Sequence, residues 1–314
     1  MSDHRPVLVD EVLEGLGPVS DGWYVDATYG RGGHCAAILE RLAADGRVLA
    51  LDKDPEAVAQ ARRRFAEEPR FEICHADFTD LGAVVTARFG AHRANGILFD
   101  LGVSSPQLDA PERGFSFSQD GPLDMRMNSA AGITLAQWLA EVEPAELGRV
   151  IAQYGEQPGA WRIAAAIVAA RSTGAITRTG QLADIVARAA PRSKRSHHPA
   201  TRVFQALRIA LNDELGALRA ALRQSLDVLA EGGRLVVISF HSLEDRIVKR
   251  FMAEHSRDDP VYAGLPDVPA HARAKLRRIG RLVRPGEAEI AANPRARSAR
   301  LRIAQRCGVT AEAT

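Results

Sequence analysis

The first hundred residues alternate short apolar runs with stretches of helical spacing, and this alternation limits the folds open to the chain. Strands that alternate with helices pair in parallel, because each helix returns the chain by a right-handed crossover. We predict strands at residues 23–28, 48–51, 71–74 and 97–99, and helices at residues 35–44 and 55–65. Such a sheet binds its ligands beyond the carboxyl ends of its strands, where the strand order reverses.

The alternation stops after residue 100. Residues 101–128 are rich in Gly, Pro, Ser and Asp and have no period, whereas residues 134–190 are typical of roughly four helices. Helical spacing then continues over residues 204–229, and the apolar run at residues 234–240 predicts a further buried strand. We interpret the helical stretch as an insertion into one sheet, because two continuous domains would leave the late strand without a partner. The predicted fold is α/β, a Rossmann-like sheet with an inserted all-helical domain, divided into residues 1–108, 109–198 and 199–314.

Composition excludes several classes of protein. Lysine and arginine number 41 against 39 acids, so any nucleic-acid site must come from local clustering of charge. The three cysteines are far apart, and His197-His198 has no third ligand at metal-binding spacing, so we expect neither a disulfide framework nor a metal site. No apolar run is long enough for a membrane span or a signal core. We expect a cytoplasmic soluble protein.

The segment VDATYGRGGH, residues 25–34, is typical of a strand, a glycine turn and a helix start. Its glycines would let the backbone approach a ligand closely. Asp52 ends the next predicted strand, 20 residues after Gly32, where a carboxylate can accept hydrogen bonds from both ribose hydroxyls of an adenosine. In a dinucleotide fingerprint counted from Gly30, the third glycine position holds Cys35. The loop therefore favours S-adenosylmethionine over NAD, and a tight turn without a ligand is the remaining alternative.

Two further strand ends carry candidate binding residues. Phe78 follows the third predicted strand and would either stack on an adenine or pack in the core. Asp100 ends the fourth strand, in FDLGVSSPQLD. The exocyclic amine of a base is a poor nucleophile, because its lone pair is delocalised, and acceptors that hold its N–H groups would help it to attack a methyl group. Asp100 would either accept from such an amine or hold the methionine amine of the cofactor.

Eight segments together resemble one family. They are HRPVLVDEVL from His4, VDATYGRGGH from Val25, LDKDP from Leu51, DLGVSSPQLD from Asp100, RGFSFSQDGPLDMRM from Arg113, HPATRVFQALRIALNDEL from His198, SFHSLEDRIVKRF from Ser239 and NPRARSARLR from Asn293. The chain resembles the bacterial small-subunit ribosomal RNA (cytosine-N(4))-methyltransferases of the MraW/RsmH type.

The resemblance implies a class I methyltransferase sheet and methyl transfer to the 4-amino group of a cytosine near the decoding centre. It implies cofactor contacts at Gly32, Gly33, His34, Asp52, Phe78, Asp100 and Gln107. The chain departs from the usual pattern at Arg31, Cys35 and Gln157, of which only Gln157 lies in the insertion.

Two basic segments indicate contact with RNA phosphates rather than a solvated charged tail. They carry Arg192, Lys194, Arg195 and Arg202, and then Arg273, Lys275, Arg277, Arg278, Arg281, Arg284, Arg295, Arg297, Arg300 and Arg302. Within SFHSLEDRIVK, Phe240 would stack on an extruded base or lie in the core, and His241 would hydrogen-bond the base or serve the fold. Ser242 is a candidate helix N-cap.

The candidate catalytic residues are Asp100, Ser104 and His241. The loop from Arg113 would close over the cytosine, with Asp124, Arg126 and its two methionines near the pocket. The substrate would be small-subunit ribosomal RNA, within the assembled subunit or as naked RNA. A homodimer stays open, because the apolar stripe at residues 204–229 fits either a core or an interface. Methyl transfer to a protein or small molecule, a binding module without catalysis, and an NAD oxidoreductase are the rival functions.

Overall fold

The computed structural model describes residues 6–191, 198–262 and 268–308, which form two compact units. The sheet unit comprises the chain up to Gly102 and from Leu215 onward, and the helical unit is Val103–Glu214. The predicted boundaries after residues 108 and 198 are therefore wrong by a few residues at the first junction and by one helix at the second. Each unit has its own core, and each is described here by itself.

Seven strands build the sheet unit in the order β3-β2-β1-β4-β5-β7-β6. The first five of these pair in parallel, whereas β7 runs antiparallel to both β5 and β6. The strand order reverses between β1 and β4, which confirms the predicted doubly wound, Rossmann-like sheet. The bounds are β1 Trp23–Asp26, β2 Arg47–Asp52, β3 Phe71–His75, β4 Ala94–Asp100, β5 Leu229–Ser239, β6 Leu276–Val283 and β7 Arg300–Arg306.

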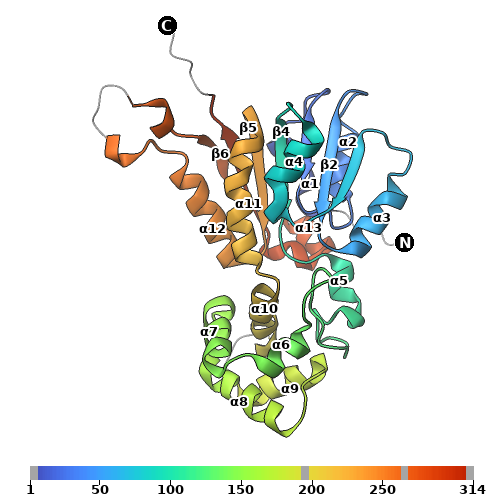
Figure 1. Ribbon diagram of the computed structural model, residues 1–314, viewed down its shortest axis with the longest axis vertical. Coiled ribbons are helices and arrows are strands. Elements are labelled where there is room, and N and C mark those ends of the chain that lie inside the picture. The colour runs from blue at the N-terminus through green and yellow to red at the C-terminus, as the bar shows by residue number, and fades with distance from the viewer. Residues whose placement is uncertain (1–5, 192–197, 263–267, 309–314) are drawn as a thin grey trace. The chain divides into compact units, whose positions relative to one another are not determined.

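Helices cover both faces of this sheet. Apolar residues of α1 Val9–Leu16, α2 Gly33–Leu39 and α3 Pro55–Arg64 pack on one face, and those of α4 Leu81–Phe89, α11 Glu214–Val228 and α12 Ser242–Glu254 pack on the other. Figure 1 shows α4 and α11 in front of the strands. Alternate residues of β4 serve the two cores, since Ile97 and Phe99 face α4 and α11 while Leu98 faces α1. Burial on both faces explains why the parallel strands are continuous apolar runs.

Two features of the carboxyl-terminal half were not predicted. The apolar stripe at residues 204–229 is two helices, α10 Pro199–Leu211 and α11, because the chain bends at Asn212 and Asp213, the latter with a φ of 45°. The basic segment contains β6 and β7, joined by α13 Glu287–Ala292 and the 3₁₀ helix η5 Pro294–Ser298. Charged residues on these outer strands hide the alternation by which a strand is identified.

The helical unit packs its helices around a second core. Its elements are α5 Ser105–Asp109, η2 Pro111–Arg113, α6 Leu135–Glu141, α7 Pro144–Gly155, α8 Ala160–Thr173, α9 Thr179–Ala189 and α10. Helix α10 belongs here, because Val203, Phe204 and Leu207 are at most 4% exposed within this core. No helix of the described residues is long and apolar enough to cross a membrane.

We expect a fragment of residues 103–214 to fold alone, and a fragment of residues 109–198 to remain unfolded. The shorter fragment lacks α10, and each large apolar side chain removed from a core costs roughly 2–5 kcal/mol. Three such losses approach the whole stability of a domain. Circular dichroism during urea titration tests this, and a cooperative transition of equal midpoint in both fragments would contradict the observed boundary.

Candidate active site at the carboxyl edge of the sheet

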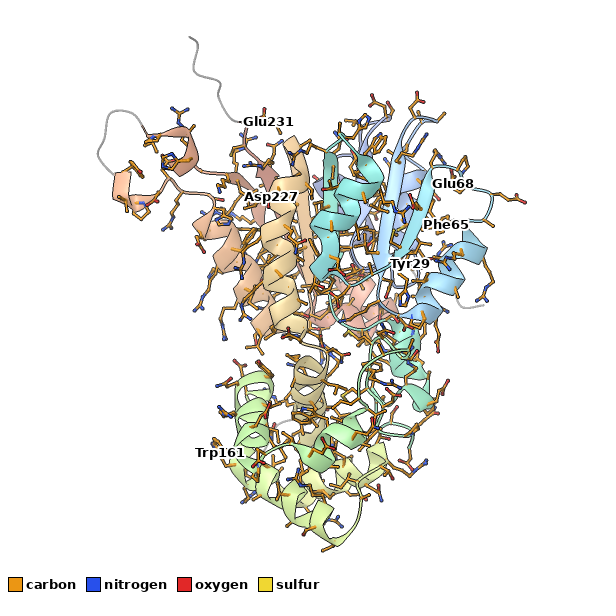
Figure 2. All side chains as sticks on the ribbon, in the orientation of Figure 1. Tyr29, Phe65, Glu68, Trp161, Asp227 and Glu231 are labelled. Atoms are coloured by element: carbon orange, nitrogen blue, oxygen red, sulfur yellow. The ribbon has the colours of Figure 1, made fainter. Side chains whose placement is uncertain are left out.

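Three neighbouring parallel strands each end on an aspartate: β1 on Asp26, β2 on Asp52 and β4 on Asp100. Because parallel strands end at one edge, the three carboxyl groups gather where the strand order reverses. Tyr29, which follows β1, lies at this edge, and Asp227 and Glu231 mark the opposite edge of the sheet unit (Figure 2). This edge holds the candidate site.

The turn between β1 and α2 is tightly packed at two glycines. Gly32 has a φ of 69°, and a Cβ atom there would lie 2.4 Å from the Tyr29 ring. A Cβ atom on Gly33 would lie 2.3 Å from the Pro6 side chain. Only glycine fits both positions. The hydroxyl of Tyr29 donates to Gln60 Oε1 at 2.6 Å, which fixes the ring that fills this space.

Asp52 fixes the turn from the neighbouring strand. Its Oδ2 accepts the Gly30 N–H at 2.8 Å, and its Oδ1 accepts the Asp54 N–H at 2.8 Å. Burial raises the pKa of Asp52 to about 6, although both N–H groups favour the ionised form. A carboxylate oxygen has two lone pairs, so each oxygen retains capacity for a ribose hydroxyl.

Asp26 is a buried carboxyl group that the sequence analysis did not single out. It is 1% exposed, accepts the Thr28 N–H at 3.1 Å, and accepts from the Cys35 thiol Sγ at 3.1 Å. Burial raises the pKa of Asp26, and it also raises the pKa of the Cys35 thiol. Cys35, at which this chain departs from the family pattern, therefore donates a hydrogen bond inside the site.

His34 lies between this carboxyl group and Asp100. Its Nε2 is 3.6 Å from Asp100 Oδ2, and the side chain is 5% exposed. Burial alone would lower the pKa of His34, but the charges of Asp100 and Asp26 outweigh it and raise the pKa. Among the described residues, neither ring nitrogen of His34 nor Asp100 Oδ1 has a hydrogen-bond partner, although all three atoms are buried. A buried polar atom without a hydrogen-bond partner destabilises the folded protein. These three atoms are therefore candidates to bind polar groups of a ligand.

Phe78 lies beside the same edge, where its packing against the core is confirmed and its stacking on an adenine stays a prediction. Its ring meets Phe99 edge to face at a centroid distance of 5.9 Å, and it packs against the sheet core while remaining partly exposed. Lys53 Nζ lies 5.9 Å from the ring centroid and pairs with Asp77 Oδ2 at 3.0 Å. The ring is therefore held between the core and the Lys53 side chain.

Ser104 and Gln107 belong to the helical unit, where they cap helix α5. Gln107 Oε1 accepts the Ser104 N–H at 2.9 Å, and the two residues form a capping box. The rest of the Gly-rich loop serves the same unit, since Met125 and Met127 are buried in its core. Their apolar side chains fill that core, and the prediction that the loop closes over the cytosine stays a prediction. Asp124 binds Arg126 through both carboxylate oxygens.

His241, rather than Ser242, is the N-cap of α12. Its Nδ1 accepts the Glu244 N–H at 3.4 Å, and Glu244 Oε2 accepts the N–H groups of Phe240 and His241. Because Nδ1 is an acceptor, the neutral ring carries its proton on Nε2. Nε2 lies 3.2 Å from Glu244 Oε1 but has no hydrogen-bond partner among the described residues.

Part of the basic carboxyl-terminal segment is used within the fold. Asp245 accepts from Arg300 Nη1 at 2.9 Å and from Arg302 Nε at 2.7 Å. Burial opposes ionisation of Asp245, but the two guanidinium groups hold its pKa below the usual range. Arg192, Lys194, Arg195 and His197 lie outside the described residues. His198 caps α10, as its Nδ1 accepts the Ala200 N–H at 3.2 Å.

Comparison with known proteins agrees with this geometry. The model of the MraW methylase family matches residues 1–307. The chain belongs to this family. It is 53% identical over 306 residues to "Ribosomal RNA small subunit methyltransferase H" of Coxiella burnetii, covering 98% of this chain and 99% of that protein. It is 52% identical over 307 residues to the protein of the same name from Nitrosococcus oceani, covering 98% of each.

One solved structure illustrates how far the similarity extends among known folds. The putative rRNA-methylase of Clostridium thermocellum aligns over 96% of this chain and 93% of its own, with 11% identity and a TM-score of 0.43. An alignment with a TM-score below 0.5 carries no weight for the fold, which rests on the strand order above.

We expect Gly32→Ala to destabilise the protein more than Gly280→Ala. Both glycines have positive φ, 69° and 63°, so both substitutions carry the strain of the left-handed region, roughly 1–2 kcal/mol. Only at residue 32 would the added Cβ meet a ring, since nothing lies within 4 Å at Gly280. Overpacking adds roughly 1–3 kcal/mol. Urea unfolding of both variants measures the difference in the free energy of unfolding. Equal losses would show that the Tyr29 ring moves aside without cost and would contradict the prediction.

Proposed function

We propose that this protein transfers the methyl group of S-adenosylmethionine to the 4-amino group of a cytosine in small-subunit ribosomal RNA. Membership of the methylase family and the printed names of the relatives support methylation of small-subunit ribosomal RNA. The choice of cytosine and of its 4-amino group follows from the family resemblance. The observation that carries the proposal is the set of buried, unpartnered atoms of His34 and Asp100 beside a glycine turn.

The residues at this edge fit the cofactor. Asp52 has oxygens that suit the ribose hydroxyls, and Gly32 and Gly33 bring the backbone close enough to contact the cofactor. Phe78 offers a partly exposed ring to the adenine. The sulfonium of the cofactor supplies an electrophilic methyl group. The family resemblance adds Gln107 as a further proposed cofactor contact.

Asp100 is the proposed acceptor for the amine that is methylated. Its Oδ1 is buried without a partner, so an N–H group that binds there removes an unfavourable desolvation. Holding the N–H group favours a pyramidal nitrogen, and the fixed geometry of the pair supplies the proximity that displacement requires. His34 Nε2 lies 3.6 Å from Asp100 Oδ2, and the interaction with Asp100 contributes to the raised pKa of His34.

Ser104 and His241 are proposed as further contacts to the cytosine. The tautomer of His241 restricts its part, because Nδ1 is occupied by the helix cap and Nε2 is a donor. His241 can therefore donate to a cytosine acceptor such as the ring carbonyl, and it is not the group that accepts the amine proton. Its proposed role is to position the base.

The substrate form and setting are also proposals. We propose that the protein acts on the assembled small subunit in the cytoplasm, with a homodimer as one candidate state. The arginines of the described carboxyl-terminal segment that have no ion pair support contact with a large polyanion. The Phe204 to Leu229 stripe gives no separate support for a dimer, because α10 and α11 bury most of its members within one chain.

The direct test is to incubate the protein with labelled S-adenosylmethionine and small subunits from a strain that lacks the enzyme, and then to map the label. We expect label on one cytosine amine. Asp100→Asn should place the label identically at an initial rate roughly 100-fold lower, the size of effect seen when one preorganised group is removed. Label on ribosomal protein, or on several nucleotides, would refute the proposal.

We expect cofactor affinity to rise with pH through the titration of Asp52. Ribose hydroxyls donate to the ionised carboxylate, and the pKa of Asp52 is about 6, so protonation below that pH competes with binding. Calorimetry with S-adenosylhomocysteine should show binding roughly tenfold weaker at pH 5 than at pH 8. Asp52→Asn should bind weakly without this dependence, and the exposed control Asp45→Asn should retain it. The same pH profile in Asp52→Asn would contradict the role of Asp52.

A further inference from the structure

A cavity of about 110 Å³ opens in the sheet unit beyond the carboxyl end of β5. One side is formed where β5 passes into α12, and the other by the segment that leads through η5 into β7. Its lining includes Phe240, His241 and Ser242 on the first side, and Arg284, Arg297 and Arg300 on the second. We name it the arginine cavity.

Positive charge converges on this cavity. Of the described residues, no aspartate or glutamate lines it, although Asp245 pairs with Arg300 and Glu244 Oε1 lies 3.2 Å from His241 Nε2. Arg284 and Arg297 are exposed, and within the described residues neither makes an ion pair or a side-chain hydrogen bond. Arg300 gives one nitrogen to Asp245 and still lines the cavity. Arg302, which stabilises the fold, is paired with a carboxylate. The two arginines without such a partner are available to bind an anionic ligand.

His241 adds a buried donor at the wall of the cavity. Its side chain is 9% exposed, and its Nε2 has no hydrogen-bond partner among the described residues. With Nδ1 engaged by the Glu244 N–H, Nε2 carries the proton. Ser242 is the first residue of α12, a helix of 13 residues whose amino end carries partial positive charge. A helix end and three guanidinium groups therefore surround one space, and the Nε2–H group of His241 at its wall is left for the base.

Strand register places the cavity beside the candidate active site. Asp100 pairs with Ile238 across β4 and β5, and Ser239 pairs with Arg300 across β5 and β7. Two strand spacings separate the backbone of Asp100 from that of Arg300, about 10 Å. Both residues lie at the carboxyl edge of the parallel strands. The distance from an anion in the cavity to a base held at Asp100 would therefore match the span of about one nucleotide.

We propose that the arginine cavity binds one backbone phosphate of the RNA next to the target nucleotide. This inference rests on the proposed function and adds to it the contact that positions the strand. Guanidinium forks match phosphate oxygens in geometry, and several forks around one phosphate bind it more specifically than a flat basic surface does. Phosphate contacts fix the register of a nucleic acid, whereas base contacts specify sequence.

The test uses Arg284→Gln, Arg297→Gln and the double variant of the full chain, with Arg63→Gln as the control. Arg63 is an exposed arginine of α3, so the control removes one charge far from the cavity in strand order. Methyl transfer to small subunits gives KM and kcat, and anisotropy with a target-spanning RNA fragment gives the salt dependence of binding. Affinity for S-adenosylhomocysteine reports whether each variant remains folded.

We expect KM for the RNA to rise roughly tenfold in each single variant, the effect of losing one charge-assisted hydrogen bond, with kcat nearly unchanged. The slope of log affinity against log salt should become shallower by about 0.7 in the double variant, the value for one phosphate of a single strand. A neutral methylphosphonate at one linkage beside the target should weaken RNA binding by the unsubstituted protein. It should leave RNA binding by the double variant unchanged.

Three results would overturn the proposal. The first is an unchanged KM and salt slope in the double variant while methyl transfer by the unsubstituted protein proceeds normally. The second is an equal loss in Arg63→Gln. The third is that inorganic phosphate binds the unsubstituted protein and not the double variant while KM for the RNA is the same in both, which would assign the cavity to a free anion. Absence of methyl transfer by the unsubstituted protein would instead refute the proposed function itself.

Discussion

The constraint on which this structure depends is the gathering of buried, titratable side chains at one edge of a parallel sheet. Asp26, Asp52 and Asp100 end three adjacent strands, and carboxylates this close repel one another unless cations or N–H groups compensate. Compensation comes from the turn after β1, where backbone N–H groups, the Cys35 thiol and the His34 ring face the carboxyl groups. The glycine turn therefore brings these donors to the acids, and its glycines leave room for the Tyr29 ring and Pro6 to pack against it.

Several of the remaining candidate residues are helix caps. His241 and Glu244 cap α12, Asp77 caps the 3₁₀ helix at Phe78, and Ser104 with Gln107 caps α5. The cap of α12 occupies Nδ1 of His241, which is why His241 offers only Nε2 to a ligand. The helical unit has a separate core, so the insertion can vary without disturbing the acids of the sheet.

Much of the fold could be predicted from the sequence, because parallel strands buried on both faces are continuous apolar runs. The strands at Val48, Phe71 and Ile97, the carboxyl-terminal strand from Arg234 and the inserted helical unit followed from that signal and from the break in alternation. The outer strands β6 and β7 did not, since Arg277, Arg278 and Arg281 obscure their period. The bend at Asn212 and Asp213 was missed because apolar spacing continues across it. The carboxyl groups of Asp52 and Asp100 were predicted, while Asp26 was not, although it too is a polar residue that ends an apolar run.

The most direct test of the central claim follows the His34 ring nitrogens by ¹⁵N NMR during titration with S-adenosylhomocysteine, with the signal assigned through His34→Gln. The account predicts that both nitrogens change at saturation with the affinity that calorimetry gives, because their unpartnered atoms face the ligand or its neighbour Asp100. The exposed ring of His92, stacked on Trp23, should not change. A titration that leaves His34 unaffected while the ligand binds would contradict the account and remove the buried acids from the cofactor site.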